Sequence, residues 1–268
     1  MLKDITLGQY FPGNSPVHRL DPRTKIVFLI VYIVALFTAS NWVSYAVVFC
    51  FLATTVAISR IPLKSILHGM KPLVMILIFT GILNIFFTTG EKLVFKIWII
   101  AIYWEGVIRA AFMMLRILML ITGTLLLTYT TSPIALTDGL ESLLNPLKKL
   151  HMPVHELSMM MCIALRFIPT LIEETDKIMS AQKARGADFE SGNLLVRVKA
   201  LVPILVPLFI SAFRRADDLA MAMECRCYQG GEGRTKMKLL RYRLLDLKAF
   251  GVGILLLTAV FIFRSFGL

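Results

Sequence analysis

The sequence predicts an all-α integral membrane protein with about five transmembrane helices and three further helices on the cytoplasmic side. The first observation is composition: 57% of the 268 residues are hydrophobic and only 17% are charged. Soluble domains contain roughly 45–50% apolar and about 25% charged residues. The second observation is a set of long apolar runs. The third is a charged central block with helical periodicity, about 110 residues long.

Five apolar runs have the character of membrane-crossing helices, because a bilayer core requires roughly 20 mainly apolar residues in a helix. They comprise residues 26–39, 42–59, 65–89, 106–129 and 248–263. Residues 93–104 are also apolar but short, and could be an interfacial or re-entrant piece or an extension of the fourth run. That run carries Arg109 and Arg116 on one helix face, which we expect to pair across the bundle or to reach an interface.

The distribution of Lys and Arg predicts the orientation, since basic residues collect in cytoplasmic loops. Residues 1–25 hold four, 60–71 three, 132–243 sixteen, 40–41 none and 90–105 two. The N-terminus and the central block are therefore expected in the cytoplasm, and five spans place the C-terminus outside. A sixth span at 93–104 would move the sixteen charges outside, which the same rule opposes. The net charge of +12 follows from this rule, so no nucleic-acid partner is expected, only membrane lipid.

We expect three regions: residues 1–130 with four membrane helices, the central region 131–243, and a last membrane helix within 244–268. No cleavable signal peptide precedes the first run, so the N-terminus is expected to be mature. In the central region, Ser132 and Pro133 predict the start of one helix. Pro153 opens a second, amphipathic helix of about 30 residues, or about 45 Å. A third helix follows residues 192–193 and ends near Arg226.

The second and third central helices match each other at an offset of 41 residues. Asp176 falls on Asp217 and Ala181 on Ala222. The triplet Ala184-Arg185-Gly186 falls on Cys225-Arg226-Cys227. Together these matches indicate two helices of one design, each ending in a small residue, an arginine and another small residue.

Such a helix end suits the binding of another protein. The C-terminus of a helix has a partial negative charge that favours a nearby cation. Gly186 suits the left-handed residue that ends a helix. A guanidinium presents five donors in a planar fork, which matches carboxylates or carbonyls. The alternative is an ordinary capping arginine in solvent, but the recurrence at matched positions favours a functional role.

The motifs "AQKARGADF" and "AMECRCYQGG", with "HRLDPRTKI" before the first run, resemble the transmembrane T component of energy-coupling factor (ECF) transporters. These are ABC-type importers of vitamins and some metal ions in the cell membranes of prokaryotes. The resemblance implies that the central helices are coupling helices, which bind two ATPase subunits and carry a substrate-binding S component. It implies docking of the ATPase subunits through Ala184, Arg185 and Gly186 at one end and Cys225, Arg226 and Cys227 at the other. The cysteines depart from the Ala-Arg-Gly pattern.

The same resemblance suggests a platform for the S component on the coupling helices. Met-rich faces adapt to several partners, although such stripes also occur in ordinary cores. Prolines within a helix would bend or hinge it. The platform is predicted to include Met159, Met160, Met161, Pro203 and Pro207.

The sequence predicts no catalytic residue, cofactor or metal site in this chain. It has no G-x-x-x-x-G-K-[ST] motif, so ATP and Mg are expected to bind the partner subunits. His151 and His155 are four apart, but Pro153 between them favours a surface pair over a metal site. Two rival functions remain open. A self-contained secondary transporter needs a substrate site at mid-membrane, and a membrane-embedded enzyme needs convergent catalytic groups within the spans.

Overall fold

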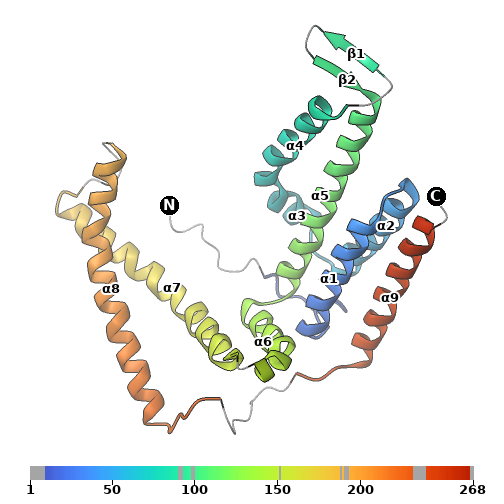
Figure 1. Ribbon diagram of the computed structural model, residues 1–268. Coiled ribbons are helices and arrows are strands. Elements are labelled where there is room, and N and C mark those ends of the chain that lie inside the picture. The colour runs from blue at the N-terminus through green and yellow to red at the C-terminus, as the bar shows by residue number, and fades with distance from the viewer. Residues whose placement is uncertain are drawn as a thin grey trace. The chain divides into compact units, whose positions relative to one another are not determined.

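The computed structural model describes residues 10–89, 93–97, 100–150, 152–187, 189, 193–231 and 240–265. Within these ranges the chain is almost entirely helical (Figure 1). It divides into two compact units, which we describe separately. The first, the membrane unit, comprises residues 10–140 and 240–265, and the second, the α7–α8 unit, comprises residues 141–231 of the described chain.

The membrane unit contains most of the helices. They are α1 (Pro22–Thr38), α2 (Trp42–Ser59), α3 (Leu63–Met70), α4 (Val74–Phe87), α5 (Trp104–Thr130), the first part of α6 (Pro133–Leu144), and α9 (Leu244–Ser265). A single 3₁₀ turn at Lys71–Leu73 joins α3 to α4. The start of α1 is locally encoded, because the Asp21 side chain accepts a hydrogen bond from the backbone N–H of Arg23 and Pro22 takes the first helical position.

Five of the described helical segments are long and apolar enough to cross a membrane. They are α2, the α3–α4 segment Leu63–Phe87, α5, α7 (Val154–Ala184) and α9. Their number agrees with the sequence prediction, but the set differs in two places. With 17 residues, α1 is shorter than all five. In contrast, α7 qualifies because most of its charged residues lie between positions 173 and 183, which leaves its first half apolar.

In the apolar segment 93–104, residues 93–97 and 100–103 are strands and not helix. Strands β1 (Leu93–Ile97) and β2 (Ile100–Tyr103) pair in antiparallel fashion, and α5 begins directly afterwards at Trp104. Of the two alternatives that the sequence left open, an extension of the fourth membrane helix is wrong, and an interfacial or re-entrant piece stays a prediction. The segment also does not form a sixth helical span. Its many β-branched and aromatic residues explain why a strand pair competes well with a helix here.

The core of the membrane unit lies between α1, α2, α5 and α9. Its fully buried side chains include Leu36, Val48, Met119 and Val260. The Tyr32 hydroxyl donates to the carbonyl oxygen of Met119 at 3.0 Å, which joins α1 to α5. Gly123 permits this approach, because a Cβ atom at that position would lie 2.6 Å from the Tyr32 ring.

Arg116 pairs across the bundle, as the sequence analysis expects. Its Nε donates to the Tyr45 hydroxyl at 2.8 Å, and its Nη2 donates to the Ala39 carbonyl at 3.1 Å. The guanidinium also lies 5.5 Å from the ring centroid of Phe37. Arg116 therefore fixes the turn between α1 and α2 to α5. Arg109 on the same helix is exposed.

The α7–α8 unit is built around two long helices, α7 (Val154–Ala184) and α8 (Leu194–Glu224). Two contacts define their relation. Arg215 pairs with Glu174 at 2.9 Å, and the Gln182 side chain reaches the Pro203 carbonyl at 3.4 Å. The later residue of α7 contacts the earlier residue of α8, so the two helices run antiparallel. Both remain continuous through their internal prolines, so the bend expected at Pro203 and Pro207 does not interrupt α8.

The end of α6 joins this unit through Glu141. One carboxylate oxygen lies 3.2 Å from His155 Nδ1, and the other accepts from the Ser158 hydroxyl at 2.9 Å. These bonds hold the first turn of α7 against α6, which continues into a 3₁₀ helix at Asn145–Leu150. His151 lies outside the described residues, and no cluster of three or more potential metal ligands occurs in the ranges that are described.

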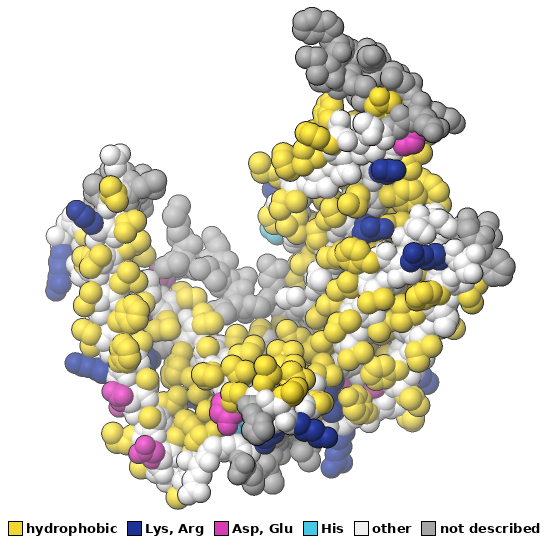
Figure 2. Space-filling view, in the orientation of Figure 1, with side chains coloured by type: hydrophobic (Ala, Val, Ile, Leu, Met, Phe, Trp, Pro, Cys, Tyr) yellow, Lys and Arg dark blue, Asp and Glu magenta, His cyan; other side chains and the backbone are white. Residues whose placement is uncertain are grey.

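Much of α8 is exposed and apolar. Figure 2 shows hydrophobic side chains along the length of this helix. They include Leu201, Val202, Leu205, Val206, Phe209, Ile210 and Phe213. An exposed apolar surface of this extent is typical of a face that contacts lipid or another protein.

Candidate functional site

The end of α7 has the hydrogen bonds of a Schellman motif. The backbone N–H of Ala187 donates to Gln182 O at 3.0 Å, and that of Gly186 donates to Lys183 O at 3.0 Å. Gly186 has a φ of +86°, the left-handed conformation that ends a helix. Arg185 is the residue immediately before this reversal.

The end of α8 repeats this motif. Tyr228 N–H donates to Met223 O at 3.1 Å, and Cys227 N–H donates to Glu224 O at 2.8 Å. Cys227 has a φ of +54° and takes the place that Gly186 has on α7. Arg226 is again the residue before the left-handed one. The sequence prediction of two helices with one design of C-terminus is therefore confirmed at the level of the backbone.

The two motifs differ in the cost of the reversal. Glycine adopts a left-handed conformation without steric penalty, whereas a residue with a Cβ pays roughly 1–2 kcal/mol. Cys227 is one of two described non-glycine residues with positive φ, the other being Arg60. The second motif thus keeps the geometry of the first in spite of a less suitable residue.

All six residues of the two triplets are exposed: Ala184, Arg185, Gly186, Cys225, Arg226 and Cys227. Their small neighbours leave both guanidinium groups accessible. Each arginine also lies at a helix C-terminus, where the partial negative charge of the last carbonyls favours a cation and positions it at the tip. An accessible planar fork of this kind can bind a carboxylate or a pair of carbonyls.

The ion pair between Glu174 and Arg215 locates the two tips. Arg185 lies eleven residues beyond Glu174, and Arg226 lies eleven residues beyond Arg215. At 1.5 Å per helical residue, each tip is about 16 Å from the ion pair. Because the helices are antiparallel, the tips point in opposite directions and lie on the order of 30 Å apart. The unit therefore presents two separate sites with the same local geometry.

The predicted platform residues do not form one patch. Met160 and Met161 are exposed near the start of α7, and Met159 is half-buried there. Pro203 and Pro207 are exposed on α8, and Pro203 contacts Gln182 near the opposite end of α7. The two groups are separated by roughly 30 Å along α7. The sequence could not reveal this, since only the antiparallel packing decides which parts of the helices meet.

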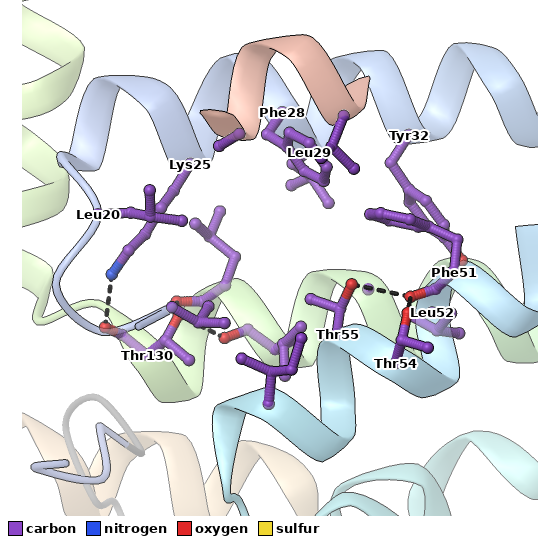
Figure 3. A pocket seen from close by; sticks show the side chains of 17 residues that line it. Leu20, Lys25, Phe28, Leu29, Tyr32, Phe51, Leu52, Thr54, Thr55 and Thr130 are labelled. Carbon is purple, nitrogen blue, oxygen red and sulfur yellow. Dashed lines mark hydrogen bonds between the residues drawn. The ribbon is translucent and has the colours of Figure 1, made fainter. Parts of the chain in front are cut away.

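The membrane unit contains a cavity of about 280 Å³ between α1, α2, α5 and α9 (Figure 3). Its wall is mainly apolar, with Phe28, Leu29 and Phe51 among the lining residues. The hydroxyls of Thr54 and Thr55 both donate to Phe51 O at 2.8 Å, so they are already bonded within their own helix. A site for a polar solute would need several free polar groups, and this wall offers few.

One set of residues escapes the sequence analysis. Asp21 and Lys25, in "HRLDPRTKI", and Asp246 at the start of α9 are all buried, although they are charged. A carboxylate in the first turn of a helix is also explained by local capping, as by the bond from the Arg243 N–H to Asp246 Oδ2, so the sequence carries no clear signal for the second partner. That partner is 225 residues away, so the sequence alone could not identify it.

The described fold and its apolar helices define this chain as an all-α, multi-pass membrane protein. Comparison with known proteins then gives its family. A family model described as cobalt transport protein (CbiQ) matches residues 13–237. The chain is also similar to proteins named energy-coupling factor transporter transmembrane protein EcfT. That of Thermosediminibacter oceani is 57% identical over 249 residues, which cover 93% of this chain and 94% of the relative.

Other relatives with the same name agree. The protein of Clostridium kluyveri is 56% identical over 250 residues, covering 93% of both chains. That of Bacillus subtilis is 49% identical over 265 residues, covering 99% of this chain and 100% of the relative. The chain belongs to the family of transmembrane components of energy-coupling factor transporters.

Proposed function

We propose that this chain transmits the ATP-driven movement of two ATPase subunits to a substrate-binding S component, for the uptake of vitamins or related micronutrients. The observation that carries the proposal is the pair of helix ends with one geometry. Arg185 and Arg226 take the same capping position, both are exposed, and they lie on opposite tips of one helix pair. Two similar but separate sites fit two ATPase subunits.

The two helices serve as rigid levers in this proposal. A movement of an ATPase subunit at one tip is carried along about 16 Å of helix to the Glu174–Arg215 ion pair and into the partner helix. The S component receives the movement at the apolar faces of α7 and α8, which include Met159, Met160 and Met161 at one end and Pro203 and Pro207 at the other.

The orientation and chemistry follow from the same proposal. The N-terminus and the α7–α8 unit face the cytoplasm of a prokaryotic cell, where basic residues collect and ATP is available. ATP and Mg bind to the ATPase subunits. This chain performs no catalysis, binds no metal or cofactor of its own, and acts through movement alone.

Substitution of the two arginines tests the proposal. Each docking contact is expected to contribute about 2–5 kcal/mol if truncation leaves a charged partner unpaired. Arg185→Ala or Arg226→Ala should therefore weaken binding of the ATPase subunits roughly 30-fold or more. The double variant should lose them during purification in mild detergent and show no uptake after reconstitution.

Arg214→Ala provides the matched control, because Arg214 is an exposed arginine on α8 that lies away from the tip. It should retain the ATPase subunits and normal uptake. Normal transport by the Arg185→Ala/Arg226→Ala protein would contradict the proposed function. Transport by the purified chain in the absence of any ATPase subunit would instead support the rival secondary transporter.

A further inference from the structure

The first turn of α1 binds the start of α9. Asp246 is 1% exposed, and its Oδ1 accepts from the backbone N–H of Asp21 at 2.9 Å. Its Oδ2 accepts from the backbone N–H of Arg243 at 2.7 Å. Asp21 in turn pairs with Arg23 at 3.0 Å, and the Arg23 guanidinium lies 4.1 Å from the centroid of the Tyr242 ring.

The same turn of α1 also binds the end of α5. Lys25 is 7% exposed, and its ammonium group has three acceptors. It donates to Thr130 O at 2.9 Å, to Thr131 Oγ1 at 3.2 Å and to His18 O at 3.3 Å. Figure 3 shows Lys25 extending to Thr130 at the edge of the cavity. All three N–H donors of the ammonium are thereby used.

The bonds of Asp246 and of Lys25 lie close to the two places where the chain passes between the membrane unit and the α7–α8 unit in sequence. After Thr130 and Thr131 the chain enters α6, it leaves the membrane unit after Leu140, and it belongs to that unit again from Leu240. The first part of α6 also packs closely on α1, because a Cβ atom at Gly139 would lie 2.9 Å from Pro22. Within the membrane unit, the segment before the chain leaves and the segment after it returns therefore both contact one short stretch, residues 18–25.

The chemistry of this junction indicates more than general stability. Burial of a lysine or an aspartate costs free energy, and well-packed apolar side chains often stabilise a fold as well or better. Charge-assisted bonds to backbone groups do something that apolar contacts cannot, because they fix the direction of the chain at each bonded peptide. Here Lys25 and Asp246 hold the backbone at Thr130, Asp21 and Arg243.

We infer that the first turn of α1 holds in place the two segments of the membrane unit from which the chain leaves toward α7 and to which it returns after α8, and that Lys25 and Asp246 are positioning residues for coupling. This inference rests on the proposed function. A helix pair can transmit movement only if the segments that attach it to the membrane helices do not move. If the bonds of Lys25 and Asp246 are removed, the ATPase subunits should still bind at Arg185 and Arg226, but their movement should displace these segments and should not reach the membrane helices.

The test measures uptake per ATP hydrolysed by the complete complex in proteoliposomes, at a temperature well below unfolding. Lys25→Met and Asp246→Asn should retain the ATPase subunits and hydrolyse ATP within twofold of the unmodified complex. Their uptake per ATP should fall at least tenfold. Lys25→Arg keeps the charge and the donors. Its uptake per ATP hydrolysed should be substantially higher than that of Lys25→Met.

A milder pair of variants guards against loss of folding. Thr131→Val removes one acceptor of Lys25 with little change of shape, and should lower the ratio two- to fivefold. Thr128→Val is its matched control, since the Thr128 hydroxyl is exposed and bonds within its own helix to Thr124 O at 3.2 Å. It should leave the ratio unchanged.

The outcomes separate this inference from the proposed function. An unchanged ratio in Lys25→Met, Asp246→Asn and Thr131→Val, with the Arg185→Ala/Arg226→Ala protein inactive, overturns the anchor alone. Loss of the ATPase subunits from the Lys25 and Asp246 variants also overturns it, because the junction would then act on docking. If the double arginine variant couples normally, the proposed function fails first.

Discussion

The tips of α7 and α8 and the first turn of α1 both rely on charged side chains, but in opposite ways. At the tips, Arg185 and Arg226 are exposed on rigid helix ends. In the junction, Lys25 and Asp246 are buried, and they bond to backbone groups and, in the case of Lys25, also to the Thr131 hydroxyl. The comparison teaches that the surroundings of a charge decide its role. Occupied charges hold this chain together, and accessible charges are available to other proteins.

The largest effect on stability should separate the two regions directly. Asp246→Asn places an amide N–H against a backbone donor, and Lys25→Met leaves the Thr130 carbonyl without its charged donor. Each should lower the free energy of unfolding by about 2–3 kcal/mol. Arg185→Ala at an exposed tip should change it by no more than about 0.5 kcal/mol. Denaturation of the purified protein in detergent or nanodiscs measures the free energy of unfolding of all three variants. Equal losses of stability would contradict the proposed difference between the buried and the exposed charges.

An effect of intermediate size should sharpen the comparison between the two tips. Cys227→Gly should stabilise the end of α8 by up to about 1 kcal/mol, because it removes the cost of a Cβ in the left-handed conformation. Gly186→Ala should destabilise the end of α7 by about the same amount. Hydrogen exchange of the amides in the last turn of each helix reports both changes.

Cys225→Gly supplies the control for this pair of variants. Cys225 has a right-handed φ of −59°, so glycine should weaken the helix there by roughly 0.5–1 kcal/mol. The same substitution two residues apart should therefore have opposite signs. Slower exchange with glycine at both positions would show that the conformation of Cys227 is not the cause.

The smallest effect concerns pH and should act on the junction but not on the tips. Burial lowers the pKa of the His18 imidazole below its ordinary value of 6.5, and the charge of Lys25 acts in the same direction. His18 Nε2 lies 3.1 Å from Phe11 O, a hydrogen bond that partly opposes this lowering of the pKa, and Nδ1 lies 2.6 Å from Ser15 Oγ.

Because the unfolded chain binds a proton more readily than the folded one, stability should be full above about pH 7 and should fall as the pH drops through 6.5 and the lowered pKa. The melting temperature should therefore decrease more between pH 7.5 and 5.5 in the unmodified protein than in His18→Gln, which does not titrate. An equal decrease in both would exclude His18 as the cause.

Local features of this chain were predictable from sequence because they depend on neighbours in the chain. The end of α7 at Gly186 and the matched end of α8 both follow from residues within one turn of each other. The secondary structure of the segment 93–104 was left open by the sequence, since a short apolar run does not distinguish a helix from a strand. Which part of α7 faces which part of α8 was also beyond local patterns.

The sequence by itself determined the membrane character, the long helices and the two arginine-tipped ends, since hydropathy, periodicity and capping act over a few residues. Only the tertiary structure decided where the other charges go. It joins Lys25 to Thr130 and Asp21 to Asp246, across 105 and 225 residues. Such bonds depend on how the helices pack. The sequence around each partner does not specify these bonds, because they form only when the helices have packed together.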